Sequence, residues 1–461
     1  MASKVARERA CLGTFLGAKS LVFWAIGGPP ARASPANPSK AERLLRLPWS
    51  SMDHPTPTRW QAHRLADPPT AFRRLGRLFD LRIDPGDPLV ERLRDGLVRA
   101  DPVADDFVAW AAARPGLGRE LFERAVRGGL PAVPDAPSEL VRWFEPLERE
   151  PAWLDRDLLE VGCRTSWRAG AAGGTVLTAM ALMGGYRSSA AVKPLAMTGA
   201  LDAMVVRRIA ETSRFVLDVI ESKTLPRFGA GFQSACRVRL MHAMVRRSLL
   251  RRADWDTAAW GVPINQTDMA ATQLEFSAIY LTGLTLLGFR FTPRERAGVM
   301  HLWRYVGTVM GVDDALMAHD YRQGLQHMVI QSLSNPSADE DSRALARALH
   351  HLPERVAATP AQLVLARVLT RYRTAVSRLT LGDAAVDDIG LPAAPLHKLV
   401  LVGSAARFGL ETLRRVVPGA HGLAERHGLR VQQTIIRDLV GPERVDYVPY
   451  AERVRPVATA A

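Results

Sequence analysis

The stretch RVRLMHAMVRRSLL, residues 237–250, repeats its apolar residues at helical spacing and carries one histidine, His242. On a helix that turns about 100° per residue, five side chains fall within about 60° of this histidine. They are Arg239, Arg246, Val238, Val245 and Leu249. Such a face suits a haem, with the histidine on iron and the arginines on the propionates, or else a buried core histidine beside surface arginines.

The same periodicity continues on both sides of this stretch. PLVERLRDGLVRA (88–100) and GRELFERAVRGGL (118–130) repeat apolar residues at i, i+3 and i+4, while alternating β-branched runs are almost absent. Pro and Gly mark the turns. We therefore predict an all-α fold in which residues 71–440 form one large helical domain. An N-terminal extension (1–70) precedes it, and an irregular tail (441–461) follows it.

Composition excludes several classes of protein. The 461 residues are 47% hydrophobic, which permits a sizeable core. Three widely separated cysteines form no CxxC pair, which excludes a zinc–thiolate site and argues against a disulfide framework. The net charge is +14, but Lys supplies only six of the 61 basic residues. An Arg-rich, Ala-, Gly- and Pro-rich chain is typical of a GC-rich genome, so we expect no nucleic-acid partner.

The first residues resemble a targeting segment. A basic start, a short apolar run and Ala31-Arg32-Ala33 together predict a signal peptide over residues 1–33, although Lys19 interrupts the apolar run. Exported and cytoplasmic locations both stay open. The run has fewer than the roughly 20 apolar residues that a stable membrane span needs.

Two further stretches could line a site. GAAGGTVLTAMALMGGY (170–186) is nearly free of polar side chains, which favours a buried core helix, although small residues also suit contact with a flat ligand. In RRIAETSRF (207–215), Arg208, Glu211 and Thr212 share one helix face. The simplest interpretation of that face is an i, i+3 ion pair between Arg208 and Glu211 beside a structural threonine.

The remaining motifs are weaker. His301, His319 and His327 lie in helical patterns without HExxH spacing, so we expect structural roles for them. No GxGxxG or GxSxG is present. In WGVPINQTDMAATQLEFS (260–277), Thr267 or Asp268 is predicted to cap a helix, whereas Asn265 and Gln266 are candidates to position water or substrate.

The order of these pieces resembles a known family. R-x-x-x-T, a gap of about thirty residues, and R-x-R-x-x-H-x-x-x-R resemble the latex-clearing rubber oxygenases, which are b-type haem oxygenases. Their wider family includes a fungal farnesyl-cleaving enzyme of mycophenolic acid biosynthesis. The resemblance covers roughly residues 90–420. It rests on GALDAMVVRRIAETSRFV (199–216), RVRLMHAMVRRSL (237–249) and the segment from WGVPINQTD to RYVGTVMGV (260–312).

This resemblance implies a globin-like helical core around haem b, with additional N- and C-terminal helices. It implies His242 as the proximal ligand, and Arg208 and Thr212 as distal donors to O2. Arg246 also falls on a family arginine position. Rubber-cleaving members carry a lysine where this chain has Glu211, and an upstream glutamate where it has Val192–Lys193. Both differences weaken the case for polyisoprene, and Glu211 is a candidate to replace the missing carboxylate.

The resemblance therefore predicts a haem-dependent oxygenase that cleaves C=C bonds with O2. The expected partner is a hydrophobic, isoprenoid-type small molecule or polymer. A haem peroxidase, a non-catalytic haem-binding protein and a basic all-α nucleic-acid binder remain alternatives, and the oligomeric state stays open.

Overall fold

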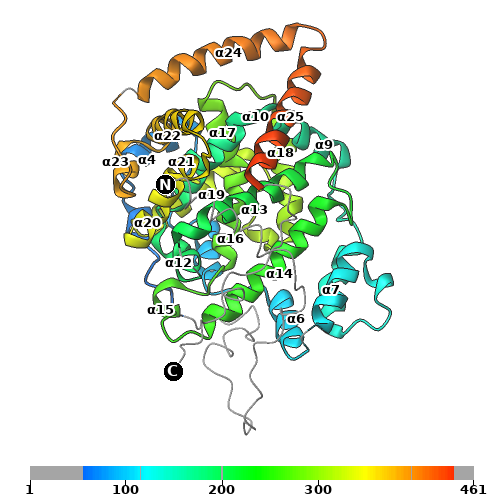
Figure 1. The fold of residues 1–461 in the computed structure, drawn as a ribbon. Coiled ribbons are helices and arrows are strands. Elements are labelled where there is room, and N and C mark those ends of the chain that lie inside the picture. Colours follow the sequence, from blue (N-terminus) through cyan, green and yellow to red (C-terminus); the bar gives the residue numbers. More distant parts are fainter. Residues whose placement is uncertain (1–54, 115, 199–200, 396, 441–461) are drawn as a thin grey trace, which may run out of the picture.

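The computed structural model describes residues 55–440, except 115, 199–200 and 396, and every regular element in this part is helical (Figure 1). The first elements are α3 (Ala62–Ala66), α4 (Thr70–Phe79), α5 (Pro88–Gly96), α6 (Pro102–Ala112), α7 (Leu117–Gly128), η1 (Leu130–Ala132), α8 (Ser138–Phe144), η2 (Glu145–Leu147) and α9 (Arg156–Arg168). The central elements are α10 (Gly170–Val176), η3 (Leu177–Leu182), α11 (Met183–Gly185), α12 (Ser189–Met197), α13 (Leu201–Glu221), α14 (Ala230–Leu250), α15 (Thr257–Trp260), α16 (Gln266–Phe276), α17 (Ala278–Leu286), α18 (Pro293–Val309), η4 (Asp314–Leu316) and α19 (Tyr321–Ser334). The last are α20 (Glu340–His350), α21 (Leu352–Val356), α22 (Pro360–Leu381), α23 (Asp383–Asp388), η5 (His397–Leu399), α24 (Val400–Val416) and α25 (Ala420–Val440).

Among the described helices, α9 and α18 make the most extensive contact. They approach closely because Gly162 of α9 meets Gly298 of α18, where a Cβ on Gly162 would lie only 2.2 Å from the Gly298 carbonyl oxygen. Leu159, Leu302 and Val306 bury apolar surface along the same contact. Helices α10, α13, α14, α16, α19 and α25 pack against this pair.

The hairpin of α13 and α14 carries the predicted site residues. The end of α13 lies against the start of α14, where the Ser234 hydroxyl donates to the Asp218 carboxylate at 2.6 Å. Arg208 is about as far from the end of α13 as His242 is from the start of α14. The two residues therefore sit at about the same level of an antiparallel pair.

The apolar stretch 170–186 is a core helix, as its composition indicates. It runs through α10, the π-helical segment η3 and α11. Gly173 faces Tyr280, and Gly283 of α17 faces Val176, each too closely for a Cβ to fit without movement. The small residues therefore serve helix–helix contact. A π-helical segment inside an α-helix is uncommon and is often found at functional sites.

The first described residues pack against the helical domain. Arg59 is buried, and its guanidinium donates to both carboxylate oxygens of Asp268 at 2.8 Å and to the Asn335 side chain at 2.9 Å. Residues 55–70 are therefore part of the folded domain. The predicted signal peptide and the tail over 441–461 lie outside the described residues.

The cap of α16 also differs from the prediction. The Asn265 side chain, not that of Thr267 or Asp268, caps the helix by accepting from the Asp268 backbone N–H at 2.9 Å. Thr267 donates to the Leu93 carbonyl oxygen, and Asp268 pairs with Arg59. Gln266 donates to two backbone carbonyl groups. These four polar side chains hold α16 in place. Among the described residues, no helix is both long and apolar enough to cross a bilayer.

Candidate functional site

The predicted buried face of α14 is the face that the structure buries. Val238, Val245 and Leu249 are buried beside Arg239 and Arg246. His242 lies among them and is largely buried. Nδ1 of the ring is buried and has no hydrogen-bond partner. Burial, aided by the nearby Arg246 charge, lowers the pKa of His242 to about 4. The imidazole is therefore neutral at pH 7, which is the form that ligates a metal.

The two arginines of this face have protein partners. Nε and Nη2 of Arg239 donate to the Asp101 carboxylate at 2.7 and 2.9 Å. Nε of Arg246 contacts both Asp105 oxygens at 2.9 Å, and Nη1 donates to the Ile264 carbonyl oxygen at 2.9 Å. Asp101 caps α6, and Asp105 lies one turn further along it. Both guanidinium groups thus hold α14 to α6. This geometry does not fit the predicted role of Arg239 and Arg246 as partners of haem propionates.

The α13 cluster is only partly as predicted. Glu211 pairs with Arg207 at 2.6 Å, and its charge also acts on the nearby Arg208. Arg208 instead donates through Nη2 to the Leu195 carbonyl oxygen at 2.7 Å, while its Nη1 is buried without a partner. The Thr212 hydroxyl makes no hydrogen bond to any described residue, unlike helical threonines such as Thr282, which donate to the carbonyl one turn back. Arg208 and Thr212 therefore retain free donors, whereas Glu211 is engaged.

The motif analysis missed a half-buried carboxyl group, that of Glu275 at the end of α16. Its Oε1 occupies the space beside Gly185, where a Cβ would lie 2.4 Å away. Burial raises the pKa of Glu275 to about 8, and no described residue forms an ion pair with it. Tyr186 links this group to α13, because both the Glu275 and Arg208 charges act on the pKa of its hydroxyl. The one available signal was an acid in the otherwise apolar run LEFSAIYL.

The other histidines have local roles or lie elsewhere. Nε2 of His301 accepts from the Asp155 backbone N–H at 2.9 Å, so it joins α18 to the start of α9. His319 forms an exposed contact with Asp314 at 3.3 Å. His327 resembles His242, because its Nδ1 is buried without a partner and burial lowers its pKa to about 4. However, its ring hydrogen-bonds the Leu316 backbone. No group of three or more metal-ligating side chains occurs in the described part of the chain.

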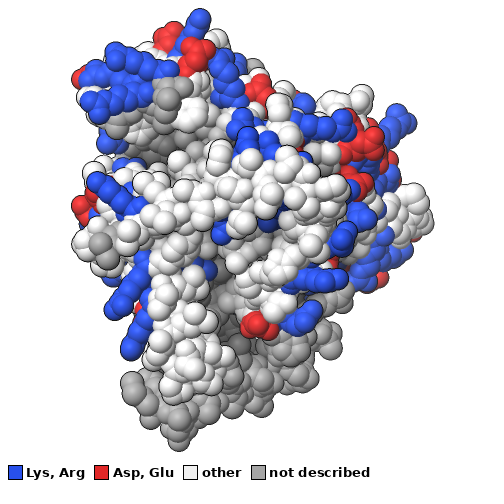
Figure 2. Space-filling model, turned by 90° about the horizontal axis from the view of Figure 1, so that it is seen from above, with Lys and Arg blue, Asp and Glu red and all other residues white. Residues whose placement is uncertain are grey.

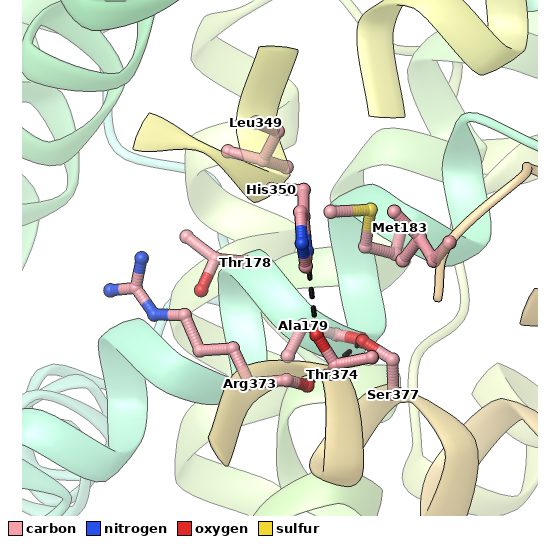
Figure 3. Close-up of a pocket in the computed structure, with 9 residues that line it drawn as sticks. Thr178, Ala179, Met183, Leu349, His350, Arg373, Thr374 and Ser377 are labelled. Atoms are coloured by element: carbon pink, nitrogen blue, oxygen red, sulfur yellow. Dashed lines mark hydrogen bonds between the residues drawn. The ribbon is translucent and has the colours of Figure 1, made fainter. Parts of the chain in front are cut away.

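Two pockets of the described surface lie away from these residues. One, between η3, α11, α20 and α22, measures about 10 Å³, which is about the space of one water molecule (Figure 3). In it the His350 ring points toward the Thr374 hydroxyl, 3.3 Å away. The other, of about 490 Å³, is lined largely by charged residues of α9, α18 and the α24–α25 region. Neither contains a predicted site residue.

The family of the chain follows from its fold and from direct comparison. Residues 167–415 match the family described as "ER-bound oxygenase mpaB/B'/Rubber oxygenase, catalytic domain", so the chain belongs to this family. The matched range starts later than the residue near 90 suggested by the motifs, and it contains all the predicted site residues.

Individual relatives are more distant. The chain is 26% identical over 290 residues to the rubber oxygenase of Streptomyces sp. (strain K30), covering 60% of this chain and 65% of that protein. The chain thus spans just under two thirds of this curated relative. A solved structure titled "Structure of Latex Clearing Protein LCP in the closed state" superposes with a TM-score of 0.53 at 20% identity. The superposition covers 73% of this chain and 91% of the latex clearing protein chain. The predicted all-α fold and the predicted family are both confirmed.

Proposed function

We propose that the protein is a haem b-dependent oxygenase that uses O2 to cleave C=C bonds of a hydrophobic, isoprenoid-type substrate. Family membership supports the oxygenase class, and the name of the relative supports a hydrophobic substrate. The observation that carries the proposal is His242, a neutral imidazole on a buried helix face whose Nδ1 has no partner. A core histidine normally satisfies both nitrogens with protein or water, so an unsatisfied one calls for an explanation such as a ligand.

The described residues fit a haem in part. His242 would hold the iron, and Arg208 and Thr212 would offer free hydrogen-bond donors. Arg239 and Arg246 are assigned no contact with the cofactor, because Asp101 and Asp105 occupy them. When bound, haem supplies the activation of O2, while the protein supplies ligation, orientation and exclusion of water.

Arg208 and Thr212 supply hydrogen-bond donors for the reaction, and Glu275 supplies an acid. Nη1 of Arg208 and the Thr212 hydroxyl stabilise negative charge that develops on a reacting oxygen, which is the general role of fixed donors in a site of low polarity. Glu275 holds its proton at pH 7 because its pKa is about 8, so it can donate a proton or return it near neutral pH. Glu211 is less suited to that role because it is paired with Arg207.

The visible spectrum of purified protein, before and after dithionite and CO, tests the cofactor directly. We expect a Soret band in the wild type and its loss in His242→Ala. His327→Ala, which removes the other buried histidine with an unpartnered Nδ1, should retain the band. A colourless wild type after haem-supplemented expression, or a Soret band unchanged in His242→Ala, would overturn the assignment.

Substrate turnover separates the related functions. An oxygenase consumes O2 with an isoprenoid alkene, whereas a haem peroxidase requires peroxide. A haem-binding protein without activity would show the Soret band and no O2 uptake with any alkene tested.

A further inference from the structure

Helix α24 turns a largely polar face toward the protein and an apolar face outward, which is the reverse of a usual surface helix. Its buried residues are Val400, Ser404, Glu411 and Arg414. Its large apolar side chains face outward, with 68% of Val402, 68% of Leu410, 55% of Leu413 and 72% of Val416 exposed. At about 100° per residue, the outward apolar positions cover an arc of about 200° opposite the buried face. Surface helices of soluble proteins normally turn such a stripe toward the core.

Contacts on the inner face fix this orientation. Glu411 is held by Arg168 at 3.4 Å and by Arg414 at 3.1 Å. The backbone of Ser404 crosses Gly288 so closely that a Cβ there would lie 2.0 Å from the Ser404 carbonyl oxygen. Rotating α24 to bury its apolar arc would break these buried ion pairs, so the apolar arc stays on the outside.

The segment that carries this arc exposes permanent charge of one sign. Between residues 397 and 430 the only two acids, Glu411 and Glu425, are buried. The exposed side chains that carry a permanent charge are all basic: Lys398, Arg407, Arg415, Arg426 and Arg430. Seen from the side on which α24 lies, the molecule shows a white band of uncharged residues bordered mainly by Lys and Arg, with smaller patches of Asp and Glu near its ends (Figure 2). Helix α22, which contacts α24, exposes a second apolar row that includes Val364, Leu365 and Val368.

We propose that the outer face of α24 docks on the surface of an anionic lipid bilayer, with the helix lying in the interfacial plane. An outward apolar arc with basic flanks is the pattern of helices that bury one face at the boundary of headgroups and acyl chains. Arg415 flanks the buried side of the helix, from which its long side chain can reach lipid phosphates, whereas the Arg407 guanidinium stacks on the Phe289 ring at 4.9 Å. The basic border selects an anionic surface over a neutral one.

Vesicle flotation of the full chain tests the proposal. The probes are vesicles of phosphatidylcholine with about one third phosphatidylglycerol, and vesicles of pure phosphatidylcholine. We expect at least tenfold more binding to the anionic vesicles, reduced severalfold when salt is raised from 0.1 to 0.5 M, because exposed charges are screened. Leu410→Asp/Leu413→Asp should lower binding at least tenfold, and Lys398→Gln/Arg415→Gln about 25-fold, at roughly fivefold for each of the two basic residues.

Matched controls lie elsewhere on the molecule. Leu117→Asp changes a comparably exposed leucine of α7, and Arg77→Gln an exposed arginine of α4, so both should bind like the wild type. Circular dichroism melts check that every variant is folded, and the charge variants keep the test valid if the leucine variants are not. Equal binding to both vesicle types, no binding, or equal effects of test and control variants would overturn the proposal. So would light scattering that shows a dimer lost in Leu410→Asp/Leu413→Asp without vesicle binding, because a second copy would then cover the face.

Discussion

Replacing Arg246 by Met tests whether this arginine stabilises the fold or binds the haem propionates. Arg246 is 1% exposed, and its guanidinium contacts both Asp105 oxygens and the Ile264 carbonyl oxygen, all at 2.9 Å. Met retains much of the apolar stem and removes the charge. The Asp105 carboxyl and the Ile264 carbonyl then stay buried without their donor.

The expected loss of stability is large. Removing one partner of a buried ion pair costs about 3–5 kcal/mol of unfolding free energy. Protonation limits this cost, because burial already raises the pKa of Asp105 to about 6 with Arg246 present, and the carboxyl becomes neutral at pH 7 once that charge is gone. We therefore expect a loss of about 3 kcal/mol for Arg246→Met.

Urea unfolding followed by circular dichroism measures this loss in haem-free and haem-loaded protein. Arg251→Met, an exposed arginine just beyond α14, should change the stability by no more than about 0.5 kcal/mol. The double variant Asp105→Leu/Arg246→Met should recover at least half of the loss, because no unpaired charge remains. If Arg246→Met destabilised only the haem-loaded protein, the arginine would serve the propionates and the assignment of its partner would be wrong.

Two further results are expected. The pKa of Glu275 is raised in the folded state, so its neutral form stabilises the fold below about pH 4.5 and this contribution is lost as the pH rises through about 8. Between pH 5 and 8, the unfolding free energy of haem-free wild type should therefore fall by about 2 kcal/mol or more relative to Glu275→Gln. A difference that stays constant with pH, measured by urea titration, would contradict this. Gly162→Ala should lower the unfolding free energy by about 2 kcal/mol or more, because its Cβ meets the α18 backbone. Gly174→Ala, at a helix position with open space around it, should instead raise the unfolding free energy by up to about 1 kcal/mol. Equal melting temperatures for the two variants would refute the argument from close packing.

Much of the fold follows from local pattern. Apolar spacing predicted the helices and the buried face of α14, because a helix of 3.6 residues per turn must place such residues on one side. The composition of residues 170–186 predicted a core helix for the same reason. The outward face of α24 is an exception, because its periodicity shows an amphipathic helix without showing which face points inward.

Partners of charged side chains were the weakest predictions. Arg239 and Arg246 were placed on the buried helix face, but the spacing of the motif gave no sign that Asp101 and Asp105 would be their partners. Glu211 was predicted to pair with Arg208, and the structure shows an ion pair with Arg207. Asp101 and Asp105 lie more than 130 residues from their arginines. Arg207 and Arg208 offer Glu211 two alternatives one residue apart, and the surroundings of the helix decide between them.

The sequence by itself determined the all-α class, the family, and the helix face on which His242 lies, because periodicity and motif spacing are local properties of the chain. Only the tertiary structure decided which carboxylates neutralise the arginines, that the Glu275 carboxyl lies beside Gly185, and that α24 turns its apolar arc outward. Those outcomes depend on which segments come into contact in the folded chain. The free energy of burying a charge or an apolar side chain depends on the residues that surround it at those contacts.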